Sequence, residues 1–174
     1  MTGGLGASGD NALGPPGIDP EEEGVDPLLV GHRLMVAGEY ELALRSYTRA
    51  AAEQGPTVDV LSGIGSANLR LGRLGQAETI LRRAIEQDET FPPAWNNLGV
   101  VLMETGRYGE ASRVFQTAFA LDDGNSAEIR ENLRLALAKL EDPSYSDDET
   151  NFALVWTGGG TYALSPLPEA GIEQ

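Results

Sequence analysis

The chain has 174 residues, enough for one domain with extensions, and 41% of them are hydrophobic, as in typical globular proteins. The formal net charge is −15, and there is no cysteine. The lack of cysteine excludes disulfides, thiolate metal sites and cysteine nucleophiles, and the acidic charge argues against binding to nucleic acid.

Charge divides the chain into three parts. Residues 1–24 carry five acidic side chains and no basic one, and residues 141–174 carry seven acidic side chains and no basic one. Residues 25–140 hold the other 15 acidic side chains and all 12 basic ones, so the net charge of this middle part is only −3. We expect residues 1–24 to form a flexible acidic leader rich in Gly and Pro, followed by a folded domain over 25–140.

A repeat of 34 residues runs through this domain. The windows 24–57, 58–91 and 92–125 align without insertion or deletion. Two columns are always glycine, one with Gly31, Gly65 and Gly99 and the other with Gly38, Gly72 and Gly106. Two more are always alanine (Ala43, Ala77, Ala111 and Ala50, Ala84, Ala118), and a further column is large and apolar (Tyr47, Leu81, Phe115). Such self-similarity indicates an architecture of stacked units.

Each column has a physical role in a pair of antiparallel helices. The small residues let two helices approach closely, and the large side chains fill the space left between them. The glycines of the second column can adopt the left-handed conformation that ends a helix. Each window is therefore predicted to form a helix A, a tight turn and a helix B.

These residues resemble the tetratricopeptide repeat, and the third window carries the pattern best, with Trp95, Leu98, Gly99, Ala111, Phe115 and Ala118. The first two windows depart from this pattern at Pro27 and Asn68, and the proline that ends the family pattern is absent from all three windows. Asp26 followed by Pro27 instead predicts a capped helix start. The resemblance implies an all-α fold, an α-solenoid of three helix-turn-helix hairpins.

Residues 126–140 predict one more amphipathic helix. Ile129, Leu133 and Leu137 follow helical spacing, and Asn125 with Glu128 is a plausible capping pair. A stack of hairpins leaves its last apolar face open, so we expect this helix to cap the C-terminal end of the solenoid.

The sequence offers no support for catalysis, a metal site or a cofactor. His32 is the single histidine, and no second histidine, cysteine or regular carboxylate pair accompanies it. Its functional interpretation is a groove contact or a pH-sensitive group, and the plainer one is a partly exposed helix residue without chemical duty. The chain is therefore predicted not to be an enzyme.

The resemblance implies that the A helices line a groove that binds a peptide segment of a partner protein. Carried over by position, the predicted groove residues are Leu28, His32, Met35, Ser62, Ser66, Leu69, Arg70, Asn96, Asn97, Val100, Met103 and Glu104. By the same resemblance, Asn97 is expected to hydrogen-bond the main chain of an extended or helical ligand. The aliphatic members could equally pack helix A against its neighbours.

The tail, residues 141–174, contains two short β-prone runs around a glycine turn and could form a hairpin. An isolated hairpin is marginally stable, so Phe152, Trp156 and Tyr162 need a surface on which to dock. One hypothesis is a segment that folds on a partner or lies in the protein's own groove. The other is a disordered tail with an apolar patch.

The predicted function is a non-enzymatic scaffold or adaptor for protein–protein interaction. The general layout also resembles the tetratricopeptide proteins of tight-adherence (Flp-type) pilus loci, which implies a role in assembly of a bacterial pilus or secretion complex. The alternative is a cytoplasmic co-chaperone or regulatory adaptor. We expect a cytoplasmic location if the chain is complete, and a periplasmic outer-membrane lipoprotein if an export signal was removed. Self-association is possible through exposed apolar residues.

Overall fold

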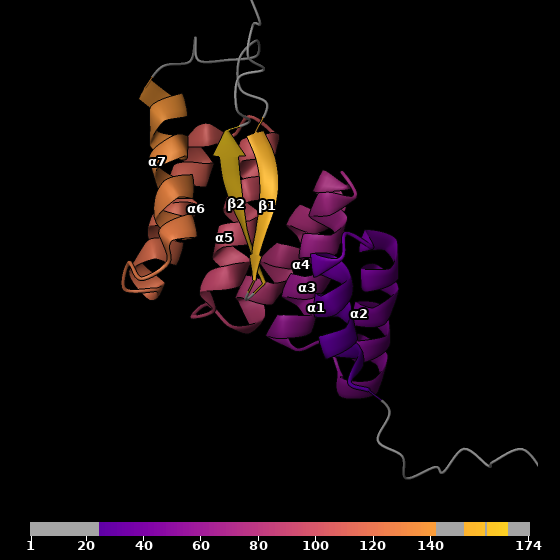
Figure 1. The fold of residues 1–174 in the computed structure, drawn as a ribbon. Helices are drawn as coiled ribbons and strands as arrows, with labels where there is room; N and C mark the ends of the chain where they lie inside the picture. The colour runs from indigo at the N-terminus through magenta and orange to yellow at the C-terminus, as the bar shows by residue number, and fades with distance from the viewer. Residues whose placement is uncertain (1–24, 142–151, 159, 167–174) are drawn as a thin grey trace, which may run out of the picture.

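The computed structural model describes residues 25–141, 152–158 and 160–166, so the predicted leader lies outside the described residues. Their elements, shown in Figure 1, are α1 (Pro27–Val36), α2 (Tyr40–Gln54), α3 (Val58–Arg70), α4 (Leu74–Gln87), α5 (Pro92–Glu104), α6 (Tyr108–Leu121), α7 (Ala127–Glu141), β1 (Phe152–Gly158) and β2 (Thr161–Pro166).

The helices form three antiparallel pairs, α1 with α2, α3 with α4 and α5 with α6, and each pair packs on the next. Helix α7 packs against α6 at the end of the stack. The predicted α-solenoid of three hairpins with a capping helix is confirmed. The two strands, which pair as an antiparallel hairpin, are an addition to this all-α architecture.

The predicted local signals for the starts and ends of helices are confirmed, with one correction. Asp26 caps α1, where its side chain accepts the N–H of Leu28, and Pro27 takes the first helical turn. The glycines that follow the A helices have positive φ, with values of 79° at Gly38, 71° at Gly72 and 74° at Gly106. The capping prediction for the last helix was wrong by one residue. Ser126, rather than Asn125, accepts the N–H of Ile129, because α7 begins only at Ala127.

The first glycine column marks the points of closest approach within each hairpin. A Cβ atom built on Gly31 would lie 2.4 Å from the ring of Tyr47, and one on Gly99 would lie 2.5 Å from the ring of Phe115. Both aromatic side chains are fully buried. A side chain on one helix thus fills the space that the glycine on the other leaves open. This explains why the first glycine column and the column of large apolar residues recur with a fixed separation in sequence.

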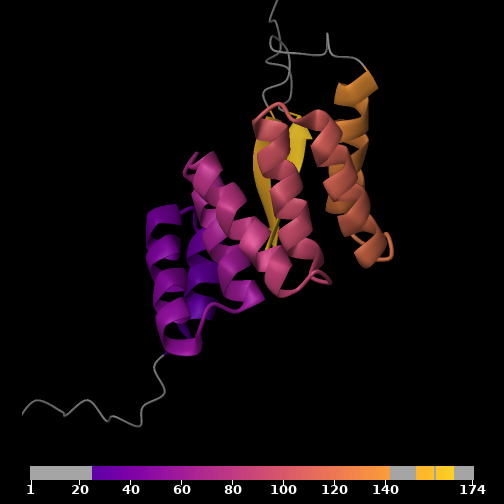
Figure 2. The same cartoon turned by 180° about the vertical axis from the view of Figure 1, so that it is seen from behind.

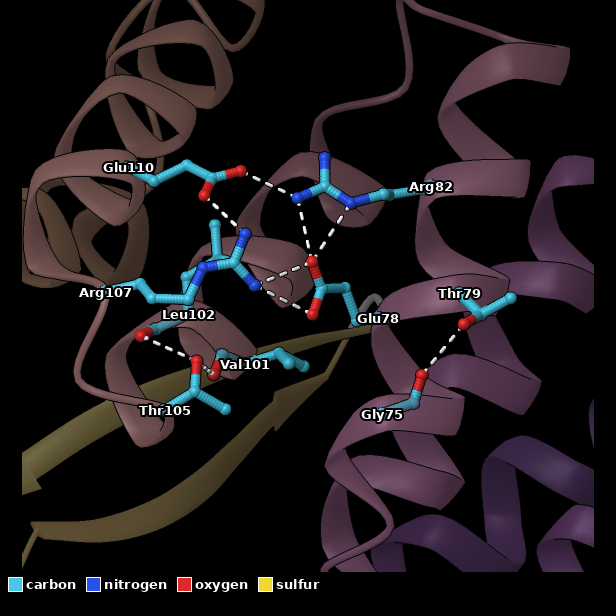
Figure 3. Close-up of polar contacts among 9 residues, drawn as sticks. All are labelled: Gly75, Glu78, Thr79, Arg82, Val101, Leu102, Thr105, Arg107 and Glu110. Atoms are coloured by element: carbon cyan, nitrogen blue, oxygen red, sulfur yellow. Dashed lines mark hydrogen bonds and ion pairs between the residues drawn. The ribbon is translucent and has the colours of Figure 1, made fainter.

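A network of four charged side chains joins the second repeat to the third (Figure 3). Glu78 and Arg82 come from α4, while Arg107 directly precedes α6 and Glu110 lies in its first turn. Arg107 donates to both oxygens of Glu78 at 2.8 and 2.9 Å, and Arg82 bridges Glu78 and Glu110 at 2.8 and 2.7 Å. The network is partly exposed to solvent, so it adds modestly to the packing between repeats.

No helix in the described part of the chain is long and apolar enough to cross a membrane.

Candidate partner-binding site

The C-terminal hairpin lies against one face of the solenoid. Strand β2 contacts α5 and α7, and β1 contacts α1. Figure 1 shows the two strands beside α7 and in front of α5, and Figure 2, the view from behind, shows them on the far side of the α5–α6 pair. We call the surface formed by α1, α3, α5 and α7 the A-helix face. The hairpin therefore lies on the surface on which the sequence predicts a bound peptide.

Two buried asparagines connect the A-helix face to the main chain of the hairpin, and a third, Asn96, supports one of them. Asn97 Nδ2 donates to the carbonyl oxygen of Gly160 at 2.6 Å and to Ser66 Oγ at 2.8 Å. Asn132 Nδ2 donates to Asn96 Oδ1 at 2.9 Å, and Asn132 Oδ1 accepts the N–H of Leu164 at 2.9 Å. All three asparagine side chains are fully buried. Because a buried amide is costly without partners, these hydrogen bonds fix the hairpin in one position.

The register of the hairpin explains why Leu164 can bond to the helix. In an antiparallel sheet, residues directly opposite each other form two kinds of pair in alternation. In the first kind the two residues hydrogen-bond each other, and in the second kind their N–H and C=O groups point away from each other. Leu164 is opposite Leu154, and its N–H points to Asn132, so this pair belongs to the second kind. The side chain of Leu164 is buried, at 2% exposure, and belongs to the main hydrophobic core. Strand β2 is thus held by an amide contact and by one apolar side chain.

Two buried polar atoms on this face have no hydrogen-bond partner within the described residues. They are Oδ1 of Asn97 and Oγ of Ser62. Asn97 therefore uses only the donor half of its amide on Ser66 and Gly160. The acceptor half of this amide has no partner among the described residues.

His32 is a half-buried residue of α1 that contacts Tyr47 of α2. The Tyr47 hydroxyl lies 3.1 Å from His32 Nδ1, and the two rings meet edge to face with centroids 5.4 Å apart. Burial lowers the pKa of His32, and the nearby charges of Asp59 and Asp26 only partly oppose this effect. Burial also raises the pKa of Tyr47. His32 is therefore a neutral packing partner of Tyr47 near neutral pH.

The charged residues predicted for the groove are placed differently from one another. Arg70, at the end of α3, donates to the Tyr40 hydroxyl, and its guanidinium lies 4.6 Å from the centre of that ring. Glu104, at the end of α5, is exposed, although partial desolvation raises the pKa of its carboxyl. No group of acidic and histidine side chains among the described residues could hold a metal ion.

Most of the predicted groove residues are buried beneath the hairpin or between helices. Leu28, His32 and Arg70 are half-buried, Glu104 is exposed, and the buried ones are Met35, Ser62, Ser66, Leu69, Asn96, Asn97, Val100 and Met103. The tail residues Phe152, Trp156 and Tyr162 belong to the strands, but their side chains lie outside the described part of the structure.

Sequence reasoning missed Asn132, Gly160 and Leu164. Asn132 could have been found, because it is a polar residue one turn after Ile129 and next to Leu133, inside the apolar stripe of the last helix. An amide at such a position needs a buried partner.

Two family models, both described as tetratricopeptide repeat, match residues 29–92 and 68–140. The chain belongs to the tetratricopeptide repeat family. Human tetratricopeptide repeat protein 7A is 33% identical over 92 residues, which are 53% of this chain and 11% of that protein. This TPR chain therefore spans only about a tenth of the length of that relative.

Solved TPR structures share the fold. The Sgt2 TPR domain from Aspergillus fumigatus aligns with a TM-score of 0.66 and 21% identity, covering 84% of this chain and 97% of that one. The first TPR of Spaghetti (RPAP3), bound to the HSP90 peptide SRMEEVD, aligns with a TM-score of 0.63 and 20% identity, covering 67% of this chain and 94% of that one. TPR domains are in general interaction modules without enzymatic activity.

Proposed function

We propose that this TPR protein is a non-enzymatic adaptor that binds an extended segment of a partner protein on its A-helix face. The observation that carries the proposal is a pair of hydrogen bonds to main-chain atoms of the hairpin: Asn97 donates to the carbonyl oxygen of Gly160, the turn residue directly before β2, and Asn132 accepts the N–H of Leu164 in β2. Main-chain atoms are common to all peptides, so the same amides can hold a strand from another protein. The RPAP3 domain, which has the same fold, holds a peptide.

The first experiment captures partners from native-host extract and identifies them by mass spectrometry. The test variant combines two exposed positions of the A helices, Leu29→Arg and Glu104→Arg, which leave the buried asparagines intact. The control, Arg83→Glu, changes an exposed residue of α4, a B helix. We expect a partner to be captured by the wild-type chain and the control and lost from the test variant. A partner captured equally by all three binds elsewhere, and the proposal fails.

The identity of the captured protein decides between two pathways. The acidic leader and three-repeat layout support assembly of a bacterial pilus or secretion complex, with a secretin or pilus component as partner. The heat-shock peptide bound by the RPAP3 domain supports the alternative, a co-chaperone. Arg70 is the one arginine or lysine among the predicted groove residues, and it already contacts Tyr40. This weighs against a clamp for an acidic chain terminus.

A further inference from the structure

The A-helix face already holds an extended chain, its own C-terminal hairpin. Residues 152–166 supply a carbonyl oxygen to Asn97 and an N–H group to Asn132, and Leu164 fills an apolar position against α5 and α7. These are the three features that a bound strand from another protein would need: an acceptor, a donor and an aliphatic side chain.

We propose that the hairpin is an internal competitor for the partner site, and that the partner is an extended aliphatic strand that replaces β2. This inference rests on the proposed function and deepens it by naming the chemistry of the bound segment. The partner segment places an N–H at Asn132 Oδ1 and an aliphatic side chain where Leu164 lies, and the residue directly before its strand places a carbonyl at Asn97 Nδ2, as Gly160 does.

The incomplete hydrogen bonding of the hairpin allows it to be displaced. Asn97 Oδ1 is buried and has no partner among the described residues. A strand that also donates an N–H to this oxygen gains one hydrogen bond that the hairpin lacks, which is worth about tenfold in affinity. The hairpin, in turn, competes from within the same chain and so acts at a high effective concentration. Partner binding is thus opposed by the hairpin without being prevented.

The test uses the full chain and a labelled synthetic peptide of residues 152–166 as the probe. Leu164→Glu removes the buried anchor of the hairpin, since Leu164 is 2% exposed. Val155→Glu is the matched control, because Val155 lies in the same hairpin but is 44% exposed. A third chain adds Asn97→Ala and Asn132→Ala to Leu164→Glu. Fluorescence anisotropy measures the affinity of each chain for the peptide.

We expect the peptide to bind the Leu164→Glu chain at least about tenfold more tightly than the wild-type chain, because burial of one leucine is worth that factor or more. The Val155→Glu chain should behave as the wild-type chain, and the third chain should lose the peptide. Equal affinity of the wild-type and Leu164→Glu chains, or no binding to any chain, would overturn the proposal.

Hydrogen exchange of the unmodified chain provides a second test that does not depend on the folding of a variant. We expect the amides of β2, including Leu164, to exchange faster than those of α5, because the hairpin opens while the helices stay folded. Equal protection of both would show that the hairpin leaves only on global unfolding, and would refute the competition. A partner that binds the A-helix face while β2 stays protected would refute this inference and leave the proposed function standing.

Discussion

Gly99 faces Phe115 so closely that an added methyl group has no room. A Cβ atom on Gly99 would lie 2.5 Å from Cε1 and 2.7 Å from both Cδ1 and Cζ of this fully buried ring. Overpacking a core costs about 1–3 kcal/mol, and a rigid ring with three atoms inside contact distance indicates the upper end of that range. The better helix propensity of alanine returns about 1 kcal/mol. We expect Gly99→Ala to lower the free energy of unfolding by about 2 kcal/mol.

Urea denaturation followed by circular dichroism measures this change through the transition midpoint. The matched control is Gly75→Ala, also within a helix, where a Cβ atom would meet no heavy atom within 4 Å. That variant should be as stable as the wild-type chain or gain up to about 1 kcal/mol. A Gly99→Ala chain as stable as the wild-type chain, with an unchanged denaturant slope, would refute the close-packing argument.

Three further predictions concern charge and buried amides. Because burial lowers the pKa of His32 from its ordinary value of 6.5, the unfolded chain binds protons more readily, and stability falls as the pH drops below 6.5; urea midpoints from about pH 7.5 to 5.5 should fall further for the wild-type chain than for His32→Gln. Burial alone would raise the pKa of Glu78, but the hydrogen bonds from two arginines outweigh it and lower the pKa. Glu78→Gln should therefore cost less than about 1 kcal/mol at low salt, and a similar loss in roughly 1 M salt would contradict an electrostatic origin. Asn132→Ala removes the acceptor of the Leu164 N–H and should cost about 1–3 kcal/mol by urea denaturation, whereas Asn125→Ala, an exposed control, should change little.

The repeat architecture could be predicted from the sequence because its determinants are local and periodic. Gly31 and Gly99 recur at one fixed distance from Tyr47 and Phe115, and each pair packs within one hairpin, so the spacing alone predicts the contact. The interpretation of Asn97 as a residue that contacts main chain came from its position in the repeat. In the structure its amide reaches the carbonyl of Gly160.

The position of the hairpin could not be predicted in the same way. Strands β1 and β2 pair with each other through local sequence, but their location depends on Asn132 and Leu164 meeting across 32 positions of the chain. Nothing in the periodicity of α7 shows which neighbour will satisfy a buried asparagine. The sequence therefore left both hypotheses for the tail open, and only the tertiary contacts show where strands β1 and β2 lie.

Because the side chains that hold the hairpin are neutral amides, we can predict how the affinity for a bound segment depends on salt. Asn97 and Asn132 are neutral, and their contacts are buried, so screening by ions has little to act on. With the Leu164→Glu chain and the hairpin peptide, we expect the affinity to change by less than about twofold between roughly 0.05 and 0.5 M salt. A clamp that grips an acidic chain terminus through arginine or lysine would instead lose about tenfold or more, since its exposed ion pairs are screened. Anisotropy titrations at several salt concentrations test this, and a steep loss of affinity would refute recognition of the main chain by neutral amides.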